Sequence, residues 1–196
     1  MRVDQLNPRQ GCFEKGPLVC SPKVFSDDRG FFLESWNYSR WKELLIEFGQ
    51  TSGDFVQDNH SRSSLGVLRG LHYQLPPHPQ GKLVRCIVGE IFDVAIDLRK
   101  SSATYLQAVG IHLTANNFKQ LWIPNGFAHG FLTLSQTAEV LYKTTDFWSP
   151  ECERSIRWDD PRIAINWPSL STSPFLSSKD AQAPLVDNIP MQDFFE

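Results

Sequence analysis

Two neighbouring stretches of the chain carry side chains that could perform proton chemistry. GVLRGLHYQ occupies residues 66–74 and QGKLVR occupies residues 80–85, which puts an imidazole, an ammonium and two guanidiniums on two β-forming segments. A general base beside fixed cations can remove a proton from carbon and stabilise the resulting oxyanion. The alternative for this pattern is an exposed hairpin with ordinary surface charges.

Period-two alternation predicts which way these side chains point. It assigns Arg69, with residues 71 and 73, to one face of the first segment, and His72, with residues 68, 70 and 74, to the other. On the second segment Lys82, Val84 and Cys86 should share a face.

A second glycine-flanked histidine, His129, ends the PNGFAH motif. Together with a glycine six residues before His72, this motif resembles the skeleton of the cupin jelly roll, which usually binds a metal through a His-x-His pair, a Glu and a distant His. Gln74 stands where the second His of that pair would be, and residues 75–79 contain no Glu. We therefore predict a metal-free site with both histidines available for acid–base work. For either histidine alone, a buried structural role is the alternative.

Other polar residues receive simpler predictions. His60, His78 and His112 are expected at surface or turn positions. Asp93 lies in the largely apolar segment 91–98 and is expected to point into a cavity.

The elements that must hold these residues are mostly strands. Only residues 38–48, followed by Gly49, have a helical pattern with a glycine stop. Strand-like runs occupy residues 18–25, 30–36, 54–62, 66–74, 82–89, 90–98, 105–113, 119–124, 129–134 and 138–148. This many strands in one short chain predicts an all-β fold, a sandwich or jelly-roll β-barrel with its ligand site inside or at the mouth.

The chain is expected to form one domain over residues 1–196. Its core should span about 18–150, and residues 151–185, with loops and short helices, should wrap the barrel. Residues 1–12 and 186–196 are interpreted as tails.

Composition limits the partners. The formal net charge is -3 and the pI is about 5.9, so we expect no nucleic acid and no membrane partner. The N-terminus lacks the apolar region of a secretory signal, and no apolar run is long enough to span a bilayer. Cysteines 12, 20, 86 and 152 are not spaced as a zinc site, and a reducing cytoplasmic setting is expected.

Seven segments in order resemble the dTDP-4-dehydrorhamnose 3,5-epimerase family. They are RGFF at 29–32, FVQDN at 55–59, LRGLHYQ at 68–74, QGKLVR at 80–85, IPNGFAHGF at 123–131, LYK at 141–143 and LSSKD at 176–180. The resemblance implies a cupin-type jelly roll, a homodimer and a dTDP-4-keto-6-deoxy sugar substrate. It implies inversion at C3 and C5, both next to the C4 ketone, without a cofactor.

The resemblance also implies roles for individual residues. His72 matches the base, Tyr142 the acid on the opposite face, Asp180 the carboxylate that orients the base, and Lys82 the group that stabilises the C4 enolate. The positions that match substrate contacts are Arg29, Glu34, Gln57, Asp58, Asn59, Arg69, His129, Glu153 and Lys179. Arg29 and Glu34 are expected to act across the dimer interface.

Three alternatives stay open at this point. The chain could be an epimerase that acts at C3 only or C5 only in another deoxysugar pathway, because the motifs do not separate these outcomes. It could be a catalytically silent sugar-nucleotide binding protein, which the full set of His72, Tyr142 and Asp180 disfavours. It could be a metal-dependent cupin oxygenase, which Gln74 disfavours.

Overall fold

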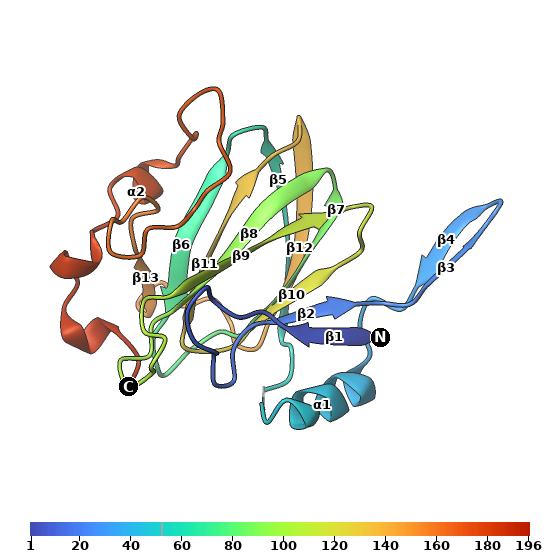
Figure 1. Ribbon diagram of the computed structural model, residues 1–196, viewed down its shortest axis with the longest axis horizontal. Coiled ribbons are helices and arrows are strands. Elements are labelled where there is room, and N and C mark those ends of the chain that lie inside the picture. Colours follow the sequence, from blue (N-terminus) through green and yellow to red (C-terminus); the bar gives the residue numbers. More distant parts are fainter. Residues whose placement is uncertain (52) are drawn as a thin grey trace.

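The computed structural model describes residues 1–51 and 53–196, and two antiparallel sheets face each other in it (Figure 1). The six-stranded sheet has the order β1 (Arg2–Gln5), β2 (Leu18–Ser21), β10 (Gln120–Ile123), β7 (Lys82–Val88), β12 (Thr137–Thr144) and β5 (Gln57–Ser64). The five-stranded sheet has the order β13 (Glu153–Ser155), β6 (Leu68–Gln74), β11 (Phe127–Thr133), β8 (Glu90–Asp97) and β9 (Ala108–Thr114).

The strand order is that of a jelly roll. Strands β5 to β12 divide four and four between the sheets, as β10-β7-β12-β5 on one side and β6-β11-β8-β9 on the other, and among them only β8 and β9 are consecutive strands of one sheet. The all-β prediction is confirmed, and strand pairing among the described residues leaves the two sheets separate. A further hairpin of β3 (Val24–Asp27) and β4 (Gly30–Leu33) projects away from both sheets (Figure 1).

Apolar side chains fill the space between the sheets. Val84 and Cys86 of β7 meet Ile91 and Ala95 of β8 in one buried cluster, which confirms the predicted common face of β7. Because side chains on a strand alternate, Lys82 lies on the same inward face of β7 as Val84 and Cys86, at the first residue of the strand.

The only run predicted to be helical is α1 (Tyr38–Glu47). Asn37 caps its N-terminus, and Gly49, with a φ of 64°, follows its last turn. Trp41 and Leu45 of the helix pack against Trp122 of the six-stranded sheet.

The interpretation of both termini as tails is wrong. Residues 2–5 form β1 and pair with β2, which extends the six-stranded sheet. At the other end, η1 (Val186–Asn188) and η2 (Met191–Asp193) follow the short helix α2 (Ser178–Ala181), and Val186, Ile189 and Phe194 are buried against the outer side of the five-stranded sheet. None of the described helices has the length and apolar character needed to cross a bilayer.

Candidate active site

A cavity of about 460 Å³ lies between the two sheets at one end of the jelly roll. Strands β5, β6, β7, β11 and β12 and the segment before and within α2 supply its walls. It brings together seven of the residues singled out by sequence, namely Arg69, His72, Lys82, His129, Tyr142, Lys179 and Asp180.

Arg69 and His72 line the same cavity, so the prediction that they point apart is wrong. The cause is an irregularity in the β6–β11 pairing. His129 lies opposite His72 and Phe131 opposite Arg69, so Gly70 and Leu71 face the single residue Gly130. The extra residue reverses the alternation between Arg69 and His72.

Glycine is required where the two strands cross this irregularity. A Cβ on Gly70, whose φ is 124°, would lie 2.6 Å from the Cα of Gly130. A Cβ on Gly130 would lie 2.8 Å from the carbonyl oxygen of Arg69. The close approach of these backbones fixes the direction in which Arg69 and His72 point.

His72 is held by Asp180, as the sequence predicts. Nε2 of His72 lies 2.6 Å from Oδ1 of Asp180, and Asp180 is only 3% exposed. Burial is the largest single influence and acts to raise the pKa of Asp180, but the contacts with His72, Ser177 and the Gly70 backbone together lower it. Ser177 caps α2 by accepting from the Asp180 backbone N–H, so the carboxylate comes from a fixed turn.

The segment that carries Asp180 is tied to the sheet. The Leu68 backbone N–H donates to the carbonyl of Phe175, and the Phe175 N–H donates to the carbonyl of Gly66. These bonds form a short parallel bridge beside β6. They explain why a residue far along the chain reaches the histidine.

His129 has its own carboxylate, which the sequence analysis did not assign. Nε2 of His129 lies 2.6 Å from Oδ1 of Asp93, and Asp93 is fully buried. Asp93 contacts the histidine and is not itself among the residues that line the cavity. The feature of the sequence that could have indicated this His–Asp pair is an aspartate within the largely apolar strand β8.

Lys82 and Tyr142 occupy neighbouring strands of the opposite sheet. Tyr142 lies across from Val84, two residues along β7 from Lys82. Burial lowers the pKa of Lys82 to about 8, while nearby carboxylates work in the other direction. Burial also raises the pKa of Tyr142, which keeps the phenol protonated. The cavity therefore offers a proton donor and a cation facing the two histidines.

Two further cations, Arg69 and Lys179, add positive charge to the cavity walls. Nε of Arg69 donates to the hydroxyl of Ser63 at 3.0 Å, which fixes the guanidinium. Nζ of Lys179 lies 2.5 Å from Oε2 of Glu153. Burial is the largest single influence and acts to raise the pKa of Glu153, but the contacts with Lys179, His72 and Trp148 together lower it. Ser63 was missed by the sequence analysis, although it lies on the same face of β5 as residues 57, 59 and 61.

Strand alternation separates three adjacent residues that the sequence grouped together. Gln57 and Asn59 share a face of β5, and Nε2 of Gln57 donates to Oδ1 of Asn59 at 2.9 Å. Asn59 is paired with Tyr142 across the strands. Asp58 points to the opposite face of the sheet, where it binds Lys143 at 2.8 Å.

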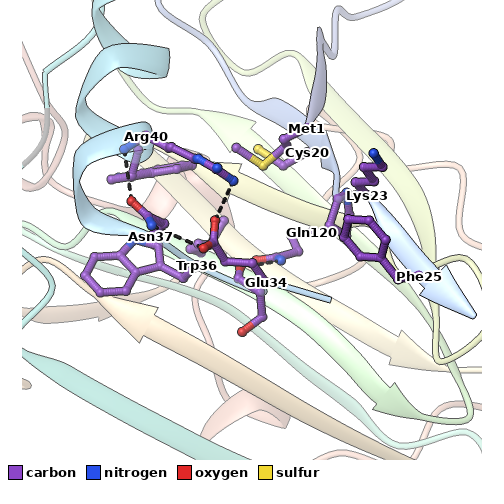
Figure 2. Close-up of a pocket in the computed structure, with 13 residues that line it drawn as sticks. Met1, Cys20, Lys23, Phe25, Glu34, Trp36, Asn37, Arg40 and Gln120 are labelled. Atoms are coloured by element: carbon purple, nitrogen blue, oxygen red, sulfur yellow. Dashed lines mark hydrogen bonds and ion pairs between the residues drawn. The ribbon is translucent and has the colours of Figure 1, made fainter. Parts of the chain in front are cut away.

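Arg29 and Glu34 are absent from the cavity lining. Arg29 lies at the tip of the β3–β4 hairpin, where it pairs with Asp27. Glu34 follows β4 and lies on the wall of a separate hollow near α1 (Figure 2). Within one protomer, neither residue contributes to the cavity around His72.

Gln74 stands where a metal-binding cupin would have its second histidine, and its side-chain amide is used in hydrogen bonds to the backbone. Nε2 of Gln74 donates to the carbonyls of His78 and Phe147, and its Oε1 accepts from the Ser149 N–H. Across residues 1–51 and 53–196, no group of three His, Cys, Asp or Glu side chains is arranged to hold a metal ion. His60, His78 and His112 lie at exposed sites, each beside a carboxylate.

The fold and the cavity define a jelly-roll enzyme built for acid–base chemistry on an anionic ligand. The family model described as dTDP-4-dehydrorhamnose 3,5-epimerase matches residues 15–188. The chain belongs to this family.

Similar proteins agree with that assignment. A dTDP-4-dehydrorhamnose 3,5-epimerase from Salmonella typhimurium is 57% identical over 170 residues, which cover 87% of this chain and 90% of the relative. A Legionella pneumophila epimerase structure in complex with dTDP-4-keto-L-rhamnose has a TM-score of 0.89 and 46% identity, and the match covers 100% of this chain and 98% of that one. A 3′-monoepimerase from Streptomyces bikiniensis in complex with dTDP-quinovose has a TM-score of 0.81 and 28% identity, with 93% and 88% covered.

Proposed function

We propose that this chain inverts C3 and C5 of dTDP-4-dehydro-6-deoxy-D-glucose to give dTDP-4-dehydro-L-rhamnose. The observation that carries the proposal is a single cavity in which His72, bonded to Asp180, shares the walls with Lys82 and Tyr142. Protons on C3 and C5 are acidic because both carbons flank the C4 ketone. A base, an acid and a cation are enough for this reaction.

Each step assigns one task to one side chain. His72 takes the proton from carbon, and the electron pair moves into the C4 carbonyl as an enolate. The contact with Asp180 favours the His72 tautomer that carries its proton on Nε2, so Nδ1 is free to act as the base. The Lys82 ammonium stabilises the enolate oxygen, and Tyr142 returns a proton to carbon from the opposite face. His72 then loses its proton to solvent and Tyr142 regains one from solvent, after which the same steps at the other carbon give the second inversion.

The remaining cavity residues are proposed to hold the nucleotide and sugar. Arg69 and Lys179 suit the diphosphate because guanidinium and ammonium groups bind phosphate oxygens. His129 lines the cavity and is proposed as a sugar or nucleotide contact. Gln57, Asn59 and Glu153 are not in the lining but contact or pair with its residues or with one another, and they are proposed for the same role. Asp58 faces away from the cavity and binds Lys143, so it is not included among these contacts.

Solvent deuterium exchange tests the proposal. The purified chain is incubated in deuterium oxide with dTDP-4-dehydro-6-deoxy-D-glucose, and NMR follows the label at each carbon. We expect deuterium at both C3 and C5, together with product of inverted configuration. Label at neither carbon would contradict the proposal and would favour a binding protein.

Epimerisation at a single carbon is the second candidate. The Streptomyces bikiniensis 3′-monoepimerase shares this fold, which makes the number of inverted centres a separate question from the fold. The same NMR measurement decides it, because label and inversion confined to C3 would identify a monoepimerase.

We further propose that the chain works as a homodimer in the cytoplasm. The β3–β4 hairpin exposes Phe25, Phe31 and Phe32, and apolar rings of this size on a projecting hairpin suit a protein interface. Its Arg29 and the nearby Glu34 would then reach a partner's cavity. Sedimentation at working concentration should give twice the chain mass, and a monomer would contradict the dimer. The four cysteines are free thiols, as a reducing compartment favours.

A further inference from the structure

Glu34 occupies a defined place at the foot of the projecting hairpin. It follows β4 and lines a hollow of about 260 Å³ whose walls also include Trp36, Trp41 and Phe25. Figure 2 shows its carboxylate turned toward the start of helix α1. Its side chain is 43% exposed, so it remains accessible to a ligand.

Both oxygens of this carboxylate are held from the first turn of α1. Nη1 of Arg40 lies 2.8 Å from Oε1 of Glu34, and Nδ2 of Asn37 donates to Oε2 at 3.2 Å (Figure 2). Oδ1 of Asn37 accepts from the Arg40 backbone N–H as the helix N-cap. Asn37 therefore joins the helix start to the carboxylate, and Arg40, the third residue of the helix, binds the other carboxylate oxygen.

We propose that Asn37 and Arg40 are positioning residues that fix Glu34 for nucleotide binding. This inference rests on the proposed function, in which Glu34 contacts the nucleotide in a partner's cavity. Neither residue touches the reacting sugar in this assignment. They act on binding by restricting the carboxylate to one orientation before the ligand arrives, which lowers the entropy lost on binding.

The chemistry of the ligand explains why such a carboxylate needs to be fixed. A thymidine diphosphate is an anion, so a free carboxylate beside its phosphates would repel it. The carboxylate can bind it favourably only through a donor, which is the thymine ring N–H or the deoxyribose hydroxyl. Arg40 offsets the negative charge of Glu34, and the two contacts direct its remaining lone pairs.

The expected effect on folding is small, which makes the test clean. The side chain of Arg40 is 69% exposed, and an exposed ion pair contributes little to stability because water screens it. A large change in ligand affinity on removing Arg40 would therefore not come from unfolding.

Four single variants and one double variant test the proposal in the full chain. Asn37→Ser keeps a helix-capping hydroxyl but removes the amide donor. Arg40→Met keeps the stem and removes the charged donor. Lys42→Met removes a positive charge from the same helix at a side chain that pairs with Asp54, and is the matched control. Glu34→Gln/Arg40→Met, measured against Glu34→Gln, shows whether Arg40 acts through Glu34.

Calorimetric titration with dTDP and steady-state kinetics give the readouts. We expect Asn37→Ser and Arg40→Met each to weaken dTDP binding and raise KM by about threefold to tenfold, with kcat within about twofold of wild type. Lys42→Met should bind as wild type does. In the Glu34→Gln background, Arg40→Met should add less than about a twofold loss.

Two results would overturn the inference. One is wild-type dTDP affinity in both Asn37→Ser and Arg40→Met. The other is an equal loss from Arg40→Met whether or not Glu34 is present. Failure of the proposed function is separate, because it would appear as absence of deuterium exchange in wild type, whereas the dTDP titration does not depend on turnover.

Discussion

His72 and His129 lie directly opposite each other across the β6–β11 strand pair, and each has its Nε2 2.6 Å from an aspartate. The two aspartates come from different places, Asp180 from α2 and Asp93 from β8. The catalytic cavity thus holds two imidazoles with separate partners, and substitutions can distinguish their roles.

His72→Ala should abolish exchange at both C3 and C5. Removal of a general base is expected to cost at least about 10²–10⁴-fold in rate. Binding of dTDP should stay close to wild type, because the proposed nucleotide contacts come from other side chains. His112→Ala is the control, since His112 is exposed and pairs with Glu90. Exchange near the wild-type rate in His72→Ala would remove His72 from the mechanism.

Asp180→Asn should lower kcat by at least about tenfold and leave the protein folded. The amide keeps the shape of the side chain but loses the charge that favours protonated His72. Since the pKa of Asp180 is lowered, the carboxylate is charged at neutral pH in the wild type. Circular dichroism and turnover, measured on the same sample, check both parts. Unchanged kcat would mean that Asp180 has no effect on the base.

Tyr142→Phe should separate exchange from inversion. Phe keeps the ring and removes the proton, so His72 can still exchange substrate protons with deuterium oxide. Net product should fall sharply, most clearly at C5. NMR of label and configuration in one reaction gives both quantities. Product formation at the normal rate would assign the acid to water or to another residue.

The Lys82 ammonium should impose an alkaline limit on kcat/KM. Its pKa is lowered to about 8 by burial, so the cation that stabilises the enolate is lost as the pH rises through about 8. Lys82→Arg should move this limit to higher pH, because a guanidinium stays charged. A limit that does not move would assign it to another group.

Lys82 should also make the free energy of unfolding depend on pH, but there the effect of rising pH is favourable. Between about pH 8 and 10.5 the unfolded chain holds a proton on Lys82 that the folded chain has released. The free energy of unfolding contributed by this group therefore rises with pH over that window. Denaturant titrations at several pH values would measure it.

Turnover should not require an added metal. Gln74 stands at the position of a usual cupin ligand, and its amide is engaged by three backbone groups. Activity after dialysis against a chelator should match that of untreated protein. Loss of activity that a divalent ion restores would contradict this prediction.

Strand alternation accounts for much of what the sequence predicts correctly. It places Lys82 at the end of the Val84 and Cys86 row, and the structure has that row facing inward. It fails at Arg69, because a one-residue irregularity in the β6–β11 pairing cannot be seen in the order of residues. A single extra residue changes the face of every side chain beyond it.

The other differences come from contacts between distant segments. Residues 1–12 carry no strong pattern, yet β1 gains stability by pairing with the edge of β2. Val186, Ile189 and Phe194 are buried because the outer side of the five-stranded sheet is apolar. The partner of His129, Asp93, depends on the register of β8 with β11, which sequence alone does not set.

The distance along the chain between His72 and Asp180 has a consequence for synthesis. The two residues are separated by 108 positions, and all of the jelly-roll strands lie before Asp180. At a typical ribosomal rate the aspartate is added roughly 5–20 s after the histidine. During that interval a nascent chain can assemble its sheets around a histidine that has no orienting carboxylate. His72 therefore gains its orienting carboxylate only after translation has passed residue 180.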